Sequence, residues 1–278
     1  MSVNSLPQKR YSSPVVRVFR IARMVIHTLY GLMIGAFVLP KVTAKQRDLI
    51  ISKWAASLLA VMNVRVIKKG HLPNRDITST MFVANHISWL DIHALNSVRA
   101  VRFVSKSEVR NWPVFGRLAV NANTLFIDRA KKQDAGRIVE ITTESLSAGD
   151  CLCYFPEGTT TDGTELKPFK GSLMQSAINN ERPIWPFVIR YPNPDGSPNI
   201  EMAYAGETSL LYSMWQIVSL KNPVVELEFL APISPKGHDR RSLTILVRQK
   251  VAEKLNLLDA VSSVDDMEFS KESAQINA

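Results

Sequence analysis

Beyond Arg75 the chain alternates short apolar runs with amphipathic segments, and this alternation limits the fold more than any other feature does. Strands are predicted over residues 80–84, 101–105, 124–127, 151–155, 184–190 and 224–230. Helices are predicted over residues 90–98, 134–147, 171–179 and 240–255. Parallel strands need a crossover connection between them, which is most often a helix. We therefore expect an α/β fold with a largely parallel central sheet flanked by helices.

The positive charge of the chain is concentrated in its N-terminal part. Residues 1–75 contain 13 lysines and arginines against one acidic residue, Asp48, whereas the remaining residues contain 21 basic and 24 acidic side chains. A basic segment of this kind attracts either nucleic acid or an anionic membrane surface. The distribution of charge alone does not choose between these two partners.

An apolar run inside this basic segment favours the membrane. Residues 24–40 are almost wholly apolar apart from His27, Thr28 and two glycines, and basic residues flank the run on both sides. The run lies at the short limit of the roughly 17–25 residues that span a bilayer. Because both flanks are basic, the positive-inside rule gives no preferred orientation. We expect a helix that dips into one leaflet and keeps both of its ends on the cytoplasmic side.

A second helix is predicted over residues 44–62, where apolar side chains recur at helical spacing. On its own this segment is equally typical of a helix packed on the core. Next to the apolar run it completes a two-helix interfacial anchor. A cleaved signal peptide is the other interpretation of the leader, but Lys41 stands directly beside the candidate cleavage site.

These features divide the chain into three predicted parts. The parts are a basic two-helix membrane anchor over residues 1–69, an α/β domain over 70–260 and a polar, disordered tail over 261–278. The expected location is the cytoplasmic face of the cell membrane, with the lipid surface as a partner and no nucleic acid.

One motif places groups for acid–base chemistry where a strand gives way to a helix. Asn-His-Ile-Ser-Trp-Leu-Asp occupies residues 85–91, directly after the apolar stretch 81–84. A neutral imidazole accepts a proton near pH 7, and a carboxylate behind it fixes its tautomer and stabilises its charged form. On a single helix His86 and Asp91 would point roughly 140° apart, so they meet only if His86 lies in the turn. Such a pair is equipped to activate a hydroxyl group.

Two further motifs lie at strand ends, where open α/β sheets bind their ligands. Phe-Pro-Glu-Gly-Thr occupies residues 155–159, and its glycine permits a close approach of the backbone. Asp128 and Arg129 follow the strand predicted over 124–127, and an arginine in this place can bind a phosphate by paired hydrogen bonds. A plain turn in the first case and an internal Asp–Arg pair in the second are the structural alternatives.

Taken in this order, the motifs resemble those of the glycerophospholipid acyltransferase family, the 1-acylglycerol-3-phosphate acyltransferases and their lysophospholipid relatives. The matching blocks are Asn-His-(four residues)-Asp at 85–91, Phe-Ile-Asp-Arg at 126–129, Phe-Pro-Glu-Gly-Thr at 155–159 and, more loosely, 183–186. The resemblance implies transfer of a fatty acyl group from acyl-CoA or acyl carrier protein to the free hydroxyl of a lysophospholipid. The first expected acceptor is 1-acylglycerol-3-phosphate, and no metal or other cofactor is implied.

The resemblance also implies roles for individual residues. His86 would act as the general base on the acceptor hydroxyl and Asp91 would orient the imidazole, so that the oxygen attacks the thioester without an acyl-enzyme. The residues expected to hold the glycerol and phosphate of the acceptor are Arg129, Glu157, Gly158 and Thr159, with Lys106 as a further candidate.

One position departs from the pattern of the family. Many members follow Phe-Pro-Glu-Gly-Thr with an arginine, and this chain has Thr160 there. Loss of a cation weakens the case for an acceptor that carries a phosphate. A lysolipid with a different head group, such as lyso-ornithine lipid, is therefore an alternative acceptor for the same chemistry.

Three hypotheses from other classes remain open on the residues alone. A serine hydrolase would use Ser88, although no Gly-x-Ser-x-Gly elbow occurs in the chain. A metal hydrolase would need His86, Asp91 and His93 together, but the last two would diverge by roughly 200° on one helix. A non-catalytic lipid-binding or nucleic-acid-binding module would explain the basic N-terminal part but would leave the motifs at the strand ends unexplained.

Overall fold

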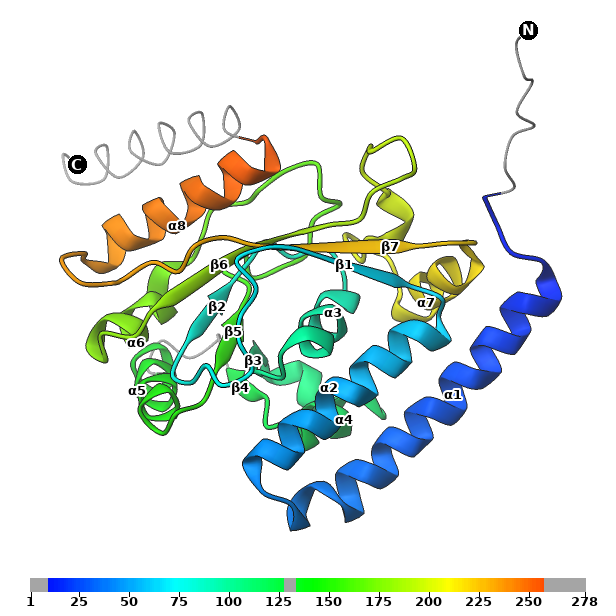
Figure 1. Cartoon of the computed structure of the whole chain (residues 1–278), viewed down its shortest axis with the longest axis horizontal. Helices are drawn as coiled ribbons and strands as arrows, with labels where there is room; N and C mark the ends of the chain where they lie inside the picture. Colours follow the sequence, from blue (N-terminus) through cyan, green and yellow to red (C-terminus); the bar gives the residue numbers. More distant parts are fainter. Residues whose placement is uncertain (1–9, 128–133, 258–278) are drawn as a thin grey trace, which may run out of the picture.

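A seven-stranded sheet forms the centre of the protein, for which a computed structural model describes residues 10–127 and 134–257. The order of strands across the sheet is β1-β7-β6-β2-β5-β3-β4 (Figure 1). The strands are β1 (Arg65–Gly70), β2 (Met81–Val83), β3 (Arg102–Lys106), β4 (Leu125–Ile127), β5 (Leu152–Tyr154), β6 (Ile184–Arg190) and β7 (Val224–Phe229). Neighbouring strands are parallel except for β6 and β7, which are antiparallel. The predicted largely parallel α/β sheet is confirmed.

Helices cover both faces of this sheet, as predicted (Figure 1). The helices are α1 (Pro14–Phe37), α2 (Ala44–Val61), α3 (Leu90–Val98), α4 (Phe115–Asn121), α5 (Asp134–Ser147), α6 (Met174–Asn179), α7 (Leu210–Ser219) and α8 (Arg240–Leu255). Four 3-10 turns connect elements: η1 (Leu39–Lys41), η2 (Ser107–Asn111), η3 (Gly171–Leu173) and η4 (Ile200–Met202).

Alternation along the strands produces a separate hydrophobic core on each face. On β2 the Phe82 side chain packs in the core shared with α1, α2, α3 and α7, whereas Met81 and Val83 pack in the core shared with α5, α6 and α8. Cys153 of β5 lies in the first core and Leu152 in the second. The site that follows these strands is therefore held between two independently packed layers of helices.

Two glycines in α1 allow this helix to pack closely on its neighbours. A Cβ atom on Gly31 would lie 2.6 Å from the indole of Trp54 in α2, and one on Gly35 would lie 2.1 Å from the side-chain amide of Asn121 in α4. These are the glycines that interrupt the apolar run of the sequence. With its turn η1, α1 is the one helix of the described residues whose length and apolar composition suffice to cross a membrane.

The structure adds three elements that the sequence pattern did not predict: β1, α4 and α7. β1 begins at Arg65 and pairs with β7, so the boundary predicted at residue 69 falls inside a strand of the sheet. β1 is an edge strand whose side chains are mostly exposed, which explains the absence of an apolar run. The predicted tail over 261–278 lies outside the described residues.

Candidate active site

The predicted site residues gather at one edge of the sheet. β2, β5, β3 and β6 run in parallel, so their carboxyl ends meet there. His86 follows β2, Glu157 follows β5, Lys106 ends β3 and Tyr191 follows β6. Arg129, a further predicted residue, lies outside the described residues.

His86 and Asp91 form a hydrogen-bonded pair. Nδ1 of His86 lies 2.8 Å from Oδ2 of Asp91, and Asp91 is fully buried in the first turn of α3. His86 lies in the preceding turn, which is the arrangement that the spacing required. Because a carboxylate only accepts hydrogen bonds, Nδ1 carries the proton and Nε2 keeps a lone pair for a proton acceptor role. The His86 side chain is 18% exposed, so it is accessible from the edge of the sheet.

The start of α3 fixes the carboxylate, and an aromatic ring fixes the imidazole. The backbone amides of Ile87 and Ser88 donate to Oδ2 of Asp91 at 2.8 and 2.9 Å. Side-chain oxygens at helix N-termini commonly accept such bonds from free backbone amides. The imidazole of His86 stacks on Phe155 with 3.9 Å between ring centres and 4° between planes. The first residue of the Phe-Pro-Glu-Gly-Thr motif thus supports the ring of His86.

Glu157 binds backbone amides, a use that its position in the motif did not indicate. Its Oε1 accepts from the amide of His86 at 2.8 Å and its Oε2 accepts from the amide of Lys167 at 3.0 Å. Burial raises the pKa of Glu157 to about 7, although the two backbone hydrogen bonds lower it in part. The carboxyl group therefore ties the backbone at His86 to the loop that leads into η3 and α6.

Gly158, Thr159 and Lys106 are the other predicted binding residues that the structure describes. Gly158 has a positive φ of 72°, the conformation for which glycine is suited. Thr159 and Lys106 are exposed at the same edge. Thr160, at the position of the family's arginine, donates its hydroxyl hydrogen bond to the carbonyl of Tyr204.

One residue of the site, Tyr191, was not predicted, and Asn85 of the first motif had been given no role of its own. The hydroxyl of Tyr191 donates to Oδ1 of Asp91 at 2.6 Å, and the amide side chain of Asn85 exchanges two hydrogen bonds with the backbone of Ile189. The available signal was the place of Tyr191 directly after a predicted strand that ends at residue 190.

His93, the third member of the metal-hydrolase hypothesis, lies elsewhere. Its ring makes edge contacts with Trp54 and Trp89, and burial lowers its pKa to about 4. Within residues 10–127 and 134–257, no group of three or more His, Cys, Asp or Glu side chains is arranged to hold a metal ion. His86 and Asp91 therefore stand as a pair, without His93.

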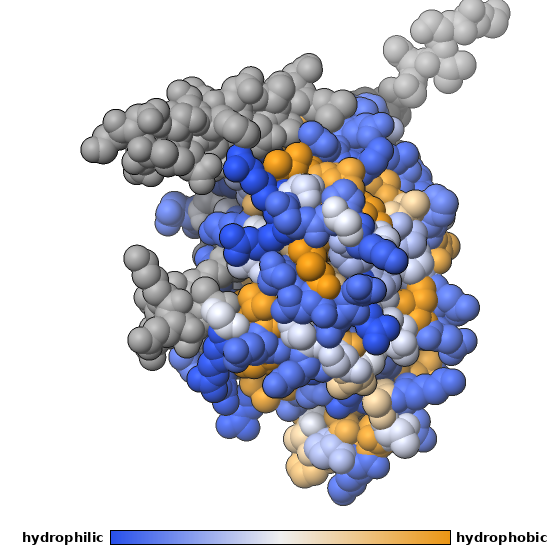
Figure 2. All heavy atoms as spheres, turned by 90° about the vertical axis from the view of Figure 1, so that its left-hand side faces the viewer, coloured by the Kyte–Doolittle hydropathy of each residue, from blue (hydrophilic) through white to orange (hydrophobic). Residues whose placement is uncertain are grey.

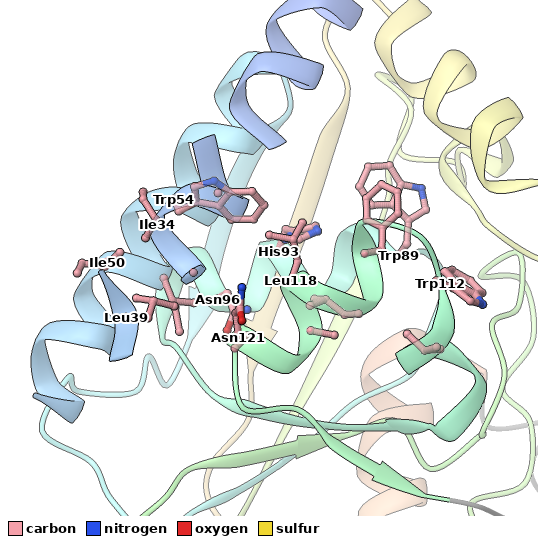
Figure 3. Close-up of a pocket in the computed structure, with 18 of the residues that line it drawn as sticks. Ile34, Leu39, Ile50, Trp54, Trp89, His93, Asn96, Trp112, Leu118 and Asn121 are labelled. Carbon is pink, nitrogen blue, oxygen red and sulfur yellow. The ribbon is translucent and has the colours of Figure 1, made fainter. Parts of the chain in front are cut away.

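An apolar cavity lies between α3 and the helices α1, α2 and α4. Side chains from α1, α2, α3 and α4 converge on a space of about 160 Å³ (Figure 3). A second apolar cavity of about 690 Å³ adjoins it and extends further along α7, to Leu211 and Met214. The two share several lining residues: Trp54, Trp89, His93, Trp112, Phe115, Leu118 and Leu210. Tyr204 lines the larger cavity, and its amide donates to the carbonyl of Ile87, next to His86.

Comparison with known proteins identifies the family to which this chain belongs. The model of the Acyltransferase family matches residues 63–190. The chain is similar to the lyso-ornithine lipid O-acyltransferase of Pseudomonas aeruginosa, with 37% identity over 198 residues that cover 71% of this chain and 75% of the relative. It is also similar to the 1-acyl-sn-glycerol-3-phosphate acyltransferase of Neisseria gonorrhoeae, with 30% identity over 208 residues, 74% of this chain and 81% of the relative.

A solved structure shares the fold. The crystal structure of the 1-acyl-sn-glycerophosphate acyltransferase of Thermotoga maritima matches with a TM-score of 0.61 and 22% identity, over 87% of this chain and 98% of that one. Family and fold therefore agree with the motifs. The chain belongs to the acyltransferase family of lysophospholipid and glycerolipid O-acyltransferases.

Proposed function

We propose that this enzyme transfers a fatty acyl group from a thioester donor to the free hydroxyl of a membrane lysolipid, with His86 as the general base. The observation that carries the proposal is the pairing of His86 Nδ1 with buried Asp91 at 2.8 Å, which leaves Nε2 available. Nε2 takes the proton of the acceptor hydroxyl while the oxygen attacks the thioester carbonyl. The new C–O bond forms, the C–S bond breaks, and Asp91 stabilises the imidazolium.

The leaving group needs little assistance from the protein. It is a thiolate whose conjugate acid has a pKa of roughly 8.5, so it departs without a strong general acid. The donor in this proposal is acyl-CoA or acyl carrier protein, and the reaction needs no metal or other cofactor. Arg129, Lys106 and Thr159 remain our candidates for contacts with the acceptor head group.

For the acceptor, Thr160 favours lyso-ornithine lipid over 1-acylglycerol-3-phosphate. Because residue 160 is a threonine, this position offers a phosphate no cation. The Thr160 hydroxyl itself already donates to the carbonyl of Tyr204. The relative from Pseudomonas aeruginosa, at 37% identity, is named for lyso-ornithine lipid. We therefore reverse the order of acceptors expected from the motifs alone and keep 1-acylglycerol-3-phosphate as the second candidate, which the Neisseria relative supports.

The apolar cavities supply space for an acyl chain. Their walls are almost wholly aliphatic and aromatic, as a hydrocarbon chain requires. The larger cavity includes Trp89, three residues after His86, and thereby lies near the start of α3. We propose that a fatty chain of one substrate lies between α3 and the α1–α2 pair during transfer.

The membrane surface is the proposed partner of α1. Apolar side chains on its outer side are exposed, including Ile26 at 67%, Tyr30 at 59% and Met33 at 57%. The basic residues at either end suit anionic head groups. We propose that α1 lies in the cytoplasmic leaflet and that the enzyme takes its lysolipid from there.

The test is a thiol-release assay with a panel of lysolipids, with acyl-CoA and acyl carrier protein as donors. We expect turnover with lyso-ornithine lipid above that with 1-acylglycerol-3-phosphate, and a loss on the order of 100-fold or more in His86→Ala and Asp91→Asn. Ser88→Ala should keep its turnover, because the mechanism uses no acyl-enzyme. If every lysolipid is inert with both donors, the proposed reaction is wrong. Trapping of an acyl group on Ser88 would favour the serine mechanism instead.

A further inference from the structure

Four donors hold the carboxylate of Asp91. Its Oδ2 accepts from Nδ1 of His86 and from the amides of Ile87 and Ser88. Its Oδ1 accepts from the hydroxyl of Tyr191 at 2.6 Å. The first three donors come from the chain directly before Asp91, whereas Tyr191 is 100 residues away in sequence.

The Tyr191 hydroxyl is suited to remain a donor. The residue is only 3% exposed. Burial, together with the charge of Asp91, raises the pKa of Tyr191 well above its usual value. The phenol therefore keeps its proton at neutral pH and donates a hydrogen bond to a carboxylate that water does not reach.

Hydrogen bonds between Asn85 and β6 fix the position of Tyr191. β2 ends at Val83, and the side chain of Asn85 then continues its pairing with β6. Nδ2 of Asn85 donates to the carbonyl of Ile189 at 3.0 Å, and the amide of Ile189 donates to Oδ1 of Asn85 at 2.9 Å. The residue before His86 thus fixes the end of β6, two residues before Tyr191.

We infer that Tyr191 is a positioning residue of the His86–Asp91 pair, a role that rests on the proposed general-base function of His86. Its hydroxyl holds Oδ1 so that Oδ2 faces the imidazole, and it lowers the negative charge that Asp91 presents to His86. A hydrogen bond donated to a carboxylate stabilises its charge and reduces its basicity. Tyr191 therefore sets the basicity of Nε2 from the other end of the carboxylate.

Other titratable groups face the pair from β5 and the loop after it. Glu157 lies close enough to Asp91 for their charges to interact, and its charge changes near neutral pH because burial raises its pKa to about 7. The thiol of Cys153 stays neutral, since burial raises its pKa well above the usual value. Glu157 and Cys153 are the same in the wild type and in the Tyr191 variants. A difference between these proteins in the pH profile therefore reports the change at Tyr191.

The test is Tyr191→Phe, which removes the hydroxyl and keeps the ring. We expect kcat to fall by about tenfold with little change in the KM for the lysolipid, because the ground-state contacts of the acceptor are unaltered. We also expect the rising limb of the pH–kcat/KM profile to move up by roughly half a unit to one unit, since Asp91 then stabilises the imidazolium more strongly. Replacement of Tyr191 by a fluorinated tyrosine, a stronger donor, should move the limb to lower pH.

The control is Tyr154→Phe. Tyr154 is also buried, at the end of β5, but its hydroxyl has no hydrogen-bond partner among the residues that the structure describes. It packs in the opposite core. This variant should leave both kcat and the pH limb unchanged.

Titration of the His86 ring by NMR separates this inference from the proposed reaction. The titration needs no substrate. A shift of the His86 titration in Tyr191→Phe therefore supports the inference even if no lysolipid is turned over. Absence of turnover would reject the proposed reaction and leave the inference standing. If Tyr191→Phe lowers the melting temperature but leaves the His86 titration and the pH limb where they are in the wild type, Tyr191 only packs the core and the inference is overturned.

Discussion

On one face of the sheet, α1, α2, α4 and α7 expose large apolar side chains, and together with α3 they enclose two apolar cavities. On the other face, α5, α6 and α8 expose only Ile245 among such side chains of the described residues. The side of the molecule that carries these three helices is mostly hydrophilic, with small hydrophobic patches (Figure 2). The first layer therefore presents the exposed apolar surface that the proposed membrane contact requires, and the second layer does not.

The same difference extends to the glycines of the two layers. In α1, Gly31 lies against Trp54 with no room for a Cβ atom, whereas Gly136 in α5 has no heavy atom within 4 Å of the place a Cβ would take. Glycine is costly in a helix interior unless a close approach requires it. In the first layer that close approach brings α1 onto α2 beside the cavities.

The largest expected effect comes from Gly31→Leu. The new side chain would push the indole of Trp54, which lines both cavities, or separate α1 from α2. We expect a loss of activity on the order of 100-fold with long-chain donors and a smaller loss with short-chain donors. The measurement is kcat/KM across a series of acyl-chain lengths.

Gly136→Leu in α5 is the matched control for this prediction. It should keep the full activity and gain up to about 1 kcal/mol in stability from its higher helix propensity. Equal losses at every chain length in Gly31→Leu would show that the cavity does not hold the chain. If both leucine variants were equally impaired, the contrast between the layers would be wrong.

Glu157 joins the two layers, and its titration gives the next largest effect. The folded-state pKa of about 7 exceeds the usual 4.5, so the folded protein binds a proton that the unfolded chain has released. The stability from this group is complete below pH 4.5 and is lost as the pH rises through 7. The free energy of unfolding of the wild type should fall by about 3 kcal/mol over this window relative to Glu157→Gln.

Urea unfolding of both proteins across this pH range measures the difference. Glu157→Gln will be less stable at low pH, because its amide nitrogen cannot accept the hydrogen bond from a backbone amide of His86 or Lys167. The prediction concerns the slope with pH, which the variant should lack. Parallel pH profiles for the two proteins would contradict it.

What the sequence predicted well depends on local pattern. The bounds of β6, α3, α5 and α8 agree with the predicted ranges, since each has a continuous apolar run or a helical period. His86 and Asp91 were paired correctly because only five residues separate them, so the turn between strand and helix decides the geometry. α7 was missed because its exposed positions carry the apolar residues Leu211, Tyr212 and Trp215, so polar side chains do not mark its outer face.

What the sequence could not predict depends on pairing between distant segments. The contact of Tyr191 with Asp91 requires the register of β2 against β6, which the Asn85–Ile189 hydrogen bonds help to fix. The partners of Glu157 are backbone amides, and no side-chain motif records those. In both cases the residue was visible in the sequence, and its use was set by tertiary structure.

Arg20 gives a smaller effect, confined to stability. It is a buried cation of α1 whose guanidinium donates to the carbonyls of Val218 and Leu220 at the end of α7, at 2.9 and 2.6 Å. Arg20→Met would leave these carbonyls unsatisfied in a buried place and should cost about 2 kcal/mol. The exposed Arg23→Met on the same helix should cost less than about 0.5 kcal/mol. Thermal unfolding of both variants checks the prediction, and equal midpoints would mean that α1 and α7 are not joined through Arg20.

The smallest expected effect concerns the outer side of α1. Ile26 and Met33 are exposed and line neither cavity, so Ile26→Glu with Met33→Glu should leave the fold and the cavities intact. Two carboxylates at the lipid interface should weaken binding to vesicles of phosphatidylcholine with phosphatidylglycerol by about tenfold or more. Ile245→Glu on α8 is the control from the other layer and should bind as the wild type does. Flotation with such vesicles measures all three proteins, and equal binding by the double variant and the wild type would remove α1 from the membrane-facing surface. Reduced binding by Ile245→Glu alone would move that surface to the α8 side, because the exposed apolar residue there would then be the one in contact with lipid.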